Sequence, residues 1–172
     1  YGNDACTQCQ PGEFVNPGSS ACGQCATGKY ADSAVLKGES CDDCPSDWYS
    51  VNAGAAACSE CPGGSVTGGA GSSTCVACLA SFFENNATDH ACHQCDAGKY
   101  SKAGESSCSV CPAGKAVNTA QTLCEECDAG EYGAAVGGLL QCKNCPLDWF
   151  SGDSGQVECN RCPAGWVTDS AK

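Results

Sequence analysis

Large apolar side chains recur along this chain at one fixed position, once in about every 17 residues. Each stands five residues after the second cysteine of a Cys-x-x-Cys motif, and only Ala116 breaks the series. The members are Phe14, Tyr30, Tyr49, Val66, Phe83, Tyr100, Tyr132, Phe150 and Val167. Because no stretch shows a sustained helical period, the pattern predicts a short strand, a turn and a return strand in every repeat. We expect each of these side chains to be the small core of its module, packed against a neighbouring disulfide.

A tight turn is expected two residues before each of these apolar positions. Glycine stands there in seven modules, and Asp47, Ser81 and Asp148 stand there in the other three. Glycine is the usual residue where the backbone needs a positive φ, and aspartate is among the better substitutes. The predicted fold class is therefore a small disulfide-rich tandem repeat, in which short β-hairpin modules stack into an extended rod with little or no helix.

The cysteines form one system. All 20 cysteines fall into ten Cys-x-x-Cys motifs, whose first cysteines are 16 to 19 residues apart with a mean of 17. No linker interrupts this spacing, so residues 1–172 are interpreted as one continuous array whose units contact mainly their neighbours. The pattern is cut within a module at both ends, and we expect nine complete modules and two partial ones from a longer protein.

A longer period overlies the module. The segment CPSDWYSVNAGAAAC that begins at Cys44 resembles CPLDWFSGDSGQVEC at Cys145, which is 101 residues further along the chain. The lengths of the loops between motifs recur with nearly the same interval. Six modules therefore form a higher unit, either as a record of duplication or because the rod presents the same face at regular intervals.

Composition changes this picture in two ways. Cysteine exceeds roughly a tenth of the chain, aromatic residues make up 7% and methionine is absent, so covalent links must replace a conventional core. The net charge of −12 speaks against nucleic acid or an anionic membrane surface as partner, and no apolar run is long enough to span a membrane. No residues assemble a nucleophile, a base and oxyanion donors, so we expect no catalytic residues, no enzyme activity and no cofactor.

The simplest connectivity joins the second cysteine of one motif to the first cysteine of the next. The expected pairs are Cys9–Cys22, Cys25–Cys41, Cys44–Cys58, Cys61–Cys75, Cys78–Cys92, Cys95–Cys108, Cys111–Cys124, Cys127–Cys142 and Cys145–Cys159. Each pair would close a loop of about 14 residues and contribute roughly 3 kcal/mol. Cys6 and Cys162 would then pair outside the chain. Spacing alone also allows neighbouring motifs to cross-link one-to-three and two-to-four.

The repeated run CPxGxYSxxGxxxCxxC resembles the ephrin-receptor-like cysteine-rich repeat, and more distantly a tumour-necrosis-factor-receptor-type module. CDAGKYSKAGESSCSVC, from Cys95 to Cys111, is the most similar copy. The resemblance covers nearly the whole chain and implies a secreted or surface-exposed series of stapled hairpins with the serial connectivity. Long arrays of this kind are also similar to cysteine-periodic surface, cell-coat and flagellar-hair proteins of protists and algae.

A few further residues carry candidate chemistry. Asn86-Ala87-Thr88 is an N-glycosylation sequon in the loop from Cys78 to Cys92, so a glycan is expected on Asn86. The three tryptophans are adjacent to the apolar ring position and are expected to point outward, to cover a disulfide or to contact a sugar or another rod. His90 and His93 are expected in a solvated loop.

The function expected from these features is structural. The chain is interpreted as a repeat protein of an extracellular filament or surface coat that self-associates laterally and carries covalent glycans. A receptor or adhesin ectodomain that binds a protein or a glycan is the alternative. A zinc array is less favoured, although two Cys-x-x-Cys motifs lie near the spacing of a four-cysteine site. We expect no metal.

Overall fold

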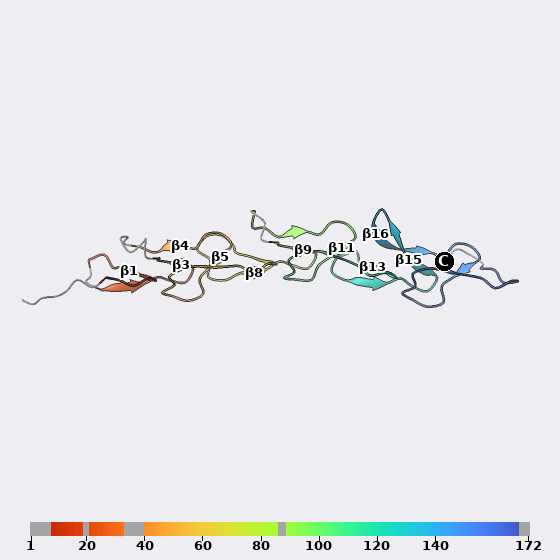
Figure 1. Ribbon diagram of the computed structural model, residues 1–172, viewed down its shortest axis with the longest axis horizontal. Coiled ribbons are helices and arrows are strands. Elements are labelled where there is room, and N and C mark those ends of the chain that lie inside the picture. The colour runs from red at the N-terminus through yellow and green to blue at the C-terminus, as the bar shows by residue number, and fades with distance from the viewer. Residues whose placement is uncertain (1–7, 19–20, 33–39, 86–88, 169–172) are drawn as a thin grey trace, which may run out of the picture. The chain divides into compact units, whose positions relative to one another are not determined.

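The computed structural model of the protein describes residues 8–18, 21–32, 40–85 and 89–168 (Figure 1). Within these ranges it contains 18 short strands and no helix, which confirms the predicted class of small disulfide-rich hairpin modules. The strands are β1 (Glu13–Val15), β2 (Cys22–Gln24), β3 (Lys29–Tyr30), β4 (Asp42–Asp43), β5 (Trp48–Tyr49), β6 (Ser59–Glu60), β7 (Ser65–Val66), β8 (Val76–Ala77), β9 (Phe82–Phe83), β10 (His93–Gln94), β11 (Lys99–Tyr100), β12 (Ser109–Val110), β13 (Lys115–Val117), β14 (Cys124–Glu126), β15 (Glu131–Val136), β16 (Leu139–Asn144), β17 (Trp149–Phe150) and β18 (Asn160–Arg161).

Consecutive strands pair into nine two-stranded antiparallel sheets. The first strand of each hairpin ends at or just after the apolar ring position, and the return strand contains the two residues between the cysteines of the next motif. In this way each Cys-x-x-Cys motif is the return strand of one module and the start of the next. The β15–β16 hairpin is the exception in length, with six paired residues on each strand around a Gly137-Gly138 turn.

The predicted turns are present in every module. All ten residues at the third position after the second cysteine have a positive φ, including Asp47 at 67°, Ser81 at 69° and Asp148 at 66°. The glycine four residues before the next first cysteine also has a positive φ wherever it occurs. The spacing therefore predicted the first bend of each module correctly, and the second glycine marks a further bend before the next cysteine.

Nine disulfides connect the modules in series, with Cα–Cα distances of 5.3 to 5.8 Å. Each joins the second cysteine of one motif to the first cysteine of the next. The pairs are Cys9–Cys22, Cys25–Cys41, Cys44–Cys58, Cys61–Cys75, Cys78–Cys92, Cys95–Cys108, Cys111–Cys124, Cys127–Cys142 and Cys145–Cys159. These sulfurs are bonded to one another and do not offer the thiolates that a zinc site requires.

The core of the modules differs from the expected one. The second cysteine of each bonded motif is buried, with at most 7% of its surface exposed, whereas the apolar ring positions are at best half-buried, with Phe150 41% and Val167 74% exposed. The expectation that the ring forms the core was therefore wrong. A strand of two residues covers only one face of the ring. The second cysteine is covered more fully because it lies where its own module contacts the next.

The chain divides into two compact units. Unit 1 contains residues 1–77 and 86–91, and unit 2 contains residues 78–85 and 92–172. The features below are described within one unit or the other.

Candidate interaction surfaces

Backbone hydrogen bonds tie several modules to the next. In four modules the N–H of the positive-φ turn residue donates to the carbonyl that follows the apolar ring in the next module, as from Gly12 to Ala31 at 2.7 Å and from Gly130 to Ser151 at 2.8 Å. A second bond runs back, from the N–H of a loop glycine to the carbonyl of the preceding module's second cysteine. Gly54 to Cys25 is one example, at 2.8 Å. The disulfides are thus supported by a second, non-covalent connection between neighbours.

Modules also touch their next-but-one neighbours. A Cβ atom placed on Gly28 would lie 2.0 Å from the carbonyl oxygen of Gly71, and one on Gly114 would lie 2.1 Å from that of Gly155. Each of these pairs joins a turn to a loop two modules further along the chain. The contacts between modules therefore reach further along the chain than the nearest-neighbour contacts that the sequence predicts.

In four modules the residue after the apolar ring is polar and buried. Ser50, Ser101 and Ser151 occupy this position with at most 5% of their surface exposed, and each hydroxyl donates to a backbone carbonyl at 2.9 to 3.0 Å. Glu84 occupies the same position in unit 2, is 1% exposed, and has no hydrogen-bond partner on either carboxylate oxygen. The serine pattern was visible in the sequence, but nothing there indicated that Glu84 would be enclosed.

His90 contacts a buried carboxylate in unit 1. Its Nδ1 lies 3.1 Å from Oδ2 of Asp47, whose side chain is fully buried and whose Oδ1 has no hydrogen-bond partner. His90 does lie in a loop and keeps 36% of its side chain exposed, so the expectation missed its partner rather than its setting, whereas His93 lies in strand β10 and not in a loop. Sequence reasoning missed this pair because the two residues are 43 positions apart and belong to modules that are not adjacent.

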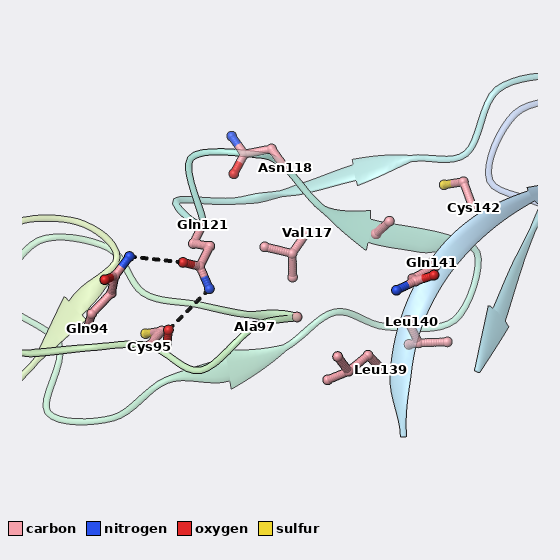
Figure 2. Close-up of a pocket in the computed structure, with 12 residues that line it drawn as sticks. Gln94, Cys95, Ala97, Val117, Asn118, Gln121, Leu139, Leu140, Gln141 and Cys142 are labelled. Atoms are coloured by element: carbon pink, nitrogen blue, oxygen red, sulfur yellow. Dashed lines mark hydrogen bonds between the residues drawn. The ribbon is translucent and has the colours of Figure 1, made fainter. Parts of the chain in front are cut away.

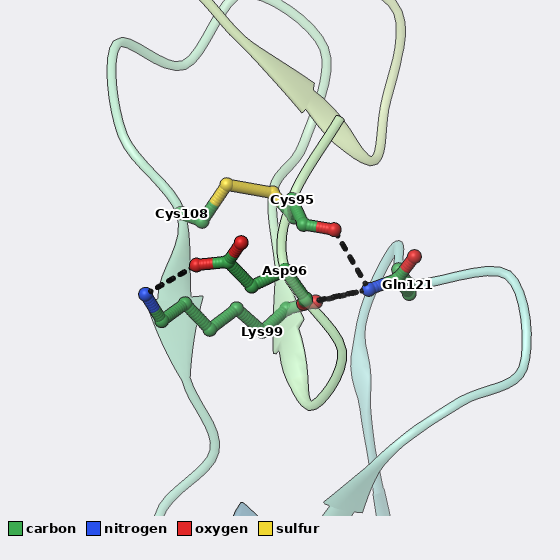
Figure 3. Close-up of polar contacts among 5 residues, drawn as sticks. All are labelled: Cys95, Asp96, Lys99, Cys108 and Gln121. Carbon is green, nitrogen blue, oxygen red and sulfur yellow. Dashed lines mark hydrogen bonds and ion pairs between the residues drawn. A yellow bond between two sulfur atoms is a disulfide. The ribbon is translucent and has the colours of Figure 1, made fainter. Parts of the chain in front are cut away.

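Gln121 fastens the loop of one module to the turn of the module before it (Figure 3). Its Nε2 donates to the carbonyls of Cys95, Asp96 and Lys99 at 3.2, 2.8 and 3.2 Å. Its backbone carbonyl accepts the N–H of Ser101 at 3.3 Å. One side chain therefore satisfies several turn carbonyls that short strands leave unpaired.

The long hairpin β15–β16 borders a groove of about 520 Å³ in unit 2 (Figure 2). Leu139 and Leu140 of β16, Val117 at the end of β13, and the amides of Gln94 and Gln121 are among the residues that line it. Leu139 packs closely against the turn at Gly98, since a Cβ atom placed on Gly98 would lie 2.5 Å from Leu139 Cδ2. This contact holds the β15–β16 hairpin against the module that contains Gly98. None of the lining residues is charged, which sets the groove apart in a chain with a net charge of −12.

An ion pair joins the strands β13 and β14. Lys115 Nζ lies 3.1 Å from Oε1 of Glu126, and the hydroxyl of Ser154 donates to Oε2 at 3.3 Å. The hydrogen bond from Lys115, its positive charge and the bond from Ser154 together lower the pKa of Glu126 below its usual value of 4.5. Because Ser154 belongs to the loop of a later module, this carboxylate connects modules as well as strands.

The tryptophans are exposed, as expected. Trp48 is 37% exposed, Trp149 is 40% exposed and Trp166 is 73% exposed. Trp149 lines a smaller hollow of about 230 Å³ together with Tyr132, Pro146, Glu158 and Cys159. Two exposed surfaces of unit 2 thus differ in character, one aliphatic and amide-lined and the other lined by rings.

Several predicted site residues stay untested by the geometry. Cys6 and the sequon at Asn86 lie outside the described residues, and Cys162 carries a free, half-exposed thiol. Among the described residues, the cluster that best approaches metal-ligand spacing is Cys9, Glu13 and Cys22, but its two sulfurs are joined as a disulfide. The described part of the chain holds no helical segment with the length and apolar character of a membrane crossing.

Comparison with known proteins assigns the family. The model of the family described as tyrosine-protein kinase ephrin type A/B receptor-like matches residues 33–78 and 133–172, which are 46 and 40 residues and so 86 of the 172. The two segments begin 100 residues apart, close to the six-module interval. No curated protein matches the chain. With nine disulfides in series, hairpin modules and a family match over half its length, the chain belongs to the ephrin-receptor-like family of cysteine-rich repeats.

Proposed function

We propose that this chain is a structural part of an extracellular filament or surface coat, in which its disulfide-stapled modules form a rod that associates laterally with further copies. The observation that carries the proposal is the double connection between modules. Each neighbouring pair of bonded motifs shares a disulfide, and the turns add backbone hydrogen bonds to the next module. Disulfides in this number persist in oxidising surroundings, which supports an extracellular location.

Repetition of the same local contacts supports a periodic surface. The N–H of Asp47 donates to Thr67 Oγ1 at 2.8 Å, and the N–H of Asp148 donates to Thr168 Oγ1 at 2.9 Å, with both members of the pair displaced by 101 residues. Equal local geometry at equal intervals is what repeated lateral contacts between copies require.

Charge limits how the copies can meet. A net charge of −12 makes copies repel one another, and salt screens that repulsion. Contacts between copies are therefore expected at uncharged exposed side chains. Leu79 and Val110 of unit 2 are examples, with 75% and 61% of their surfaces exposed.

Sedimentation velocity of the oxidised chain, at several concentrations and at low and moderate salt, tests the proposal. We expect association that grows with concentration and with salt. The double substitution Leu79→Glu and Val110→Glu should shift the chain toward monomer.

The matched control is Lys102→Glu. Lys102 is exposed, and its substitution gives the same net charge as the double variant, since each change lowers the net charge from −12 to −14. If the control weakened association as much as the double variant, charge rather than apolar contact would govern it. A chain that stayed monomeric under every condition would rule out the lateral association.

A receptor or adhesin function is the second candidate, and the uncharged groove beside β16 favours it. A groove that combines leucine and valine side chains with amides suits a single protein partner. This function predicts soluble monomers with one preferred partner, whose binding Val117→Glu would abolish and Lys102→Glu would not.

A further inference from the structure

The three tryptophans share one local motif. Each stands in a Cys-Pro-x-x-Trp sequence. In each, the backbone N–H of the tryptophan donates to the backbone carbonyl of the proline at 3.0 to 3.1 Å. In the turns that hold Trp48 and Trp149, the residue before the tryptophan is Asp47 or Asp148, with a positive φ of 67° or 66°. The tight turn therefore presents a pyrrolidine ring and an indole ring from the same four residues.

In unit 2 this turn meets a tyrosine of the preceding module. Tyr132 of β15, Pro146 and Trp149 of β17 line the hollow of about 230 Å³, and Glu158 and Cys159 complete it. Tyr132 is half-buried, which fixes its ring, while Trp149 keeps 40% of its surface exposed. Three of the five residues that line this hollow therefore carry a ring.

Unit 1 repeats the three rings. Tyr30, Pro45 and Trp48 occupy the same places in their modules, Tyr30 is half-buried like Tyr132, and Trp48 is 37% exposed. The charged neighbours are not repeated. Ala57 stands where unit 2 has Glu158, and the strand partner of Trp48 is Glu60, whereas that of Trp149 is Arg161. What the two sets of equivalent residues share is therefore the rings and not the charges.

We propose that each Tyr-Pro-Trp surface, formed by Tyr132, Pro146 and Trp149 in unit 2 and by Tyr30, Pro45 and Trp48 in unit 1, binds a proline-rich segment of another protein in the polyproline II conformation. Grooves lined by aromatic rings accept such segments because the extended helix is already formed and loses little entropy on binding. The net charge of −12 favours segments that are neutral or basic.

Two observations favour this occupant over others. The polar side-chain atoms common to both surfaces are the tyrosine hydroxyl and the indole N–H, which is few for a sugar that carries a hydroxyl on most of its carbons. The chain itself holds seven prolines, and no two are closer than six residues, so a second copy would not supply the segment.

Isothermal titration of the oxidised chain with a decaproline peptide tests the proposal. We expect two peptides bound per chain. Trp48→Ala and Trp149→Ala should each remove one of them, and the double variant should bind about thirtyfold more weakly, as befits the loss of buried hot-spot tryptophans. Trp149→Phe, which keeps a ring, should lose less than Trp149→Ala.

Trp166 supplies the matched control. It stands in the same motif and is 73% exposed. The hollow that it lines, of about 500 Å³, is bordered by the charged Asp148 and Arg161 and by no tyrosine, so Trp166→Ala should leave the binding unchanged. Disulfide mapping and amide exchange of each variant show whether the hairpins remain folded.

The proposal is overturned if decaproline does not bind, or if Trp166→Ala weakens binding as much as Trp149→Ala. It is also overturned if a neutral oligosaccharide such as cellohexaose binds in place of the peptide and is lost with the same tryptophans. The same holds if the double variant changes self-association while decaproline binding persists, since the surface would then meet another copy of the chain.

Discussion

At the scale of single residues, glycine at the positive-φ turn serves two purposes. At Asp47, Ser81 and Asp148 a side chain is tolerated, so the dihedral alone does not demand glycine. At Gly28 the carbonyl of Gly71 occupies the place of a Cβ atom, and the close approach excludes any side chain. Where the turn residue is a glycine, the sequence does not show which of the two purposes it serves.

This distinction gives a matched pair of substitutions. Gly28→Ala should destabilise unit 1 by more than Gly18→Ala, because both residues have a positive φ, at 78° and 76°, but Gly18 has no atom within 4 Å of a new Cβ. The strain common to both is about 1 kcal/mol. Urea unfolding of the oxidised variants measures the difference in the free energy of unfolding. Equal losses of stability in the two variants would show that the contact with Gly71 does not contribute.

Gln121 gives a second prediction for a single side chain. Gln121→Ala leaves the carbonyls of Cys95, Asp96 and Lys99 without their shared donor and should cost about 1 to 3 kcal/mol. Gln94→Ala is the control, because Gln94 contacts Gln121 through one amide pair at 3.3 Å and bonds no turn carbonyl. Amide exchange at Ser101, which donates to the Gln121 carbonyl, should accelerate in the first variant and stay slow in the second.

At the scale of elements, pairs of very short strands depend on the side-chain contacts made between the two strands. The β13–β14 pair carries the ion pair between Lys115 and Glu126, and the loop of a later module adds Ser154. The β15–β16 hairpin instead gains length from its Gly137-Gly138 turn, with φ of 61° and 85°, which suits the twist of paired strands. The sequence VGGL at this turn signals a hairpin, but not that Leu139 would reach back to the turn at Gly98.

The lowered pKa of Glu126 fixes the direction of a pH effect. A carboxylate whose pKa is lower in the folded than in the unfolded chain stabilises the fold above its unfolded pKa, and this contribution is lost as the pH falls through the folded value. NMR titration should place the pKa of Glu126 below 4.5, and Lys115→Gln should raise it toward 4.5. Lys102→Gln should leave it unchanged. A titration near 4.5 in the unsubstituted chain would contradict the pairing.

At the scale of the whole molecule, stability is distributed along the chain. Nine disulfides and the hydrogen bonds between modules link each unit to near neighbours, as in other repeat arrays. A defect in unit 1 should therefore weaken the modules around it and leave distant modules protected.

Replacing Cys25 and Cys41 by serine tests this distribution. The loss of one staple should cost about 3 kcal/mol, felt within unit 1 around β3 and β5. Amide exchange should accelerate there and stay unchanged at β13 and β14 of unit 2. If protection were lost throughout the chain, the array would unfold as a single cooperative body.

The sequence by itself determined the repeat, the hairpin of each module and the position of the positive-φ turn that follows each bonded motif. These follow from local rules, because a turn residue and a cysteine at a fixed spacing bend and staple the chain within one module. It also pointed to serial bridges, while spacing alone left a crossed alternative that the structure does not adopt.

Only the tertiary structure decided what each module packs against. The enclosure of the second cysteines, the burial of Glu84 and the meeting of His90 with Asp47 depend on residues one or two modules away. So does the assembly of Tyr132, Pro146 and Trp149 into one hollow. A repeat spacing specifies the local bend of the backbone. These contacts depend instead on the rotation and translation from one module to the next, and the hydrogen bonds that fix them form only in the folded chain.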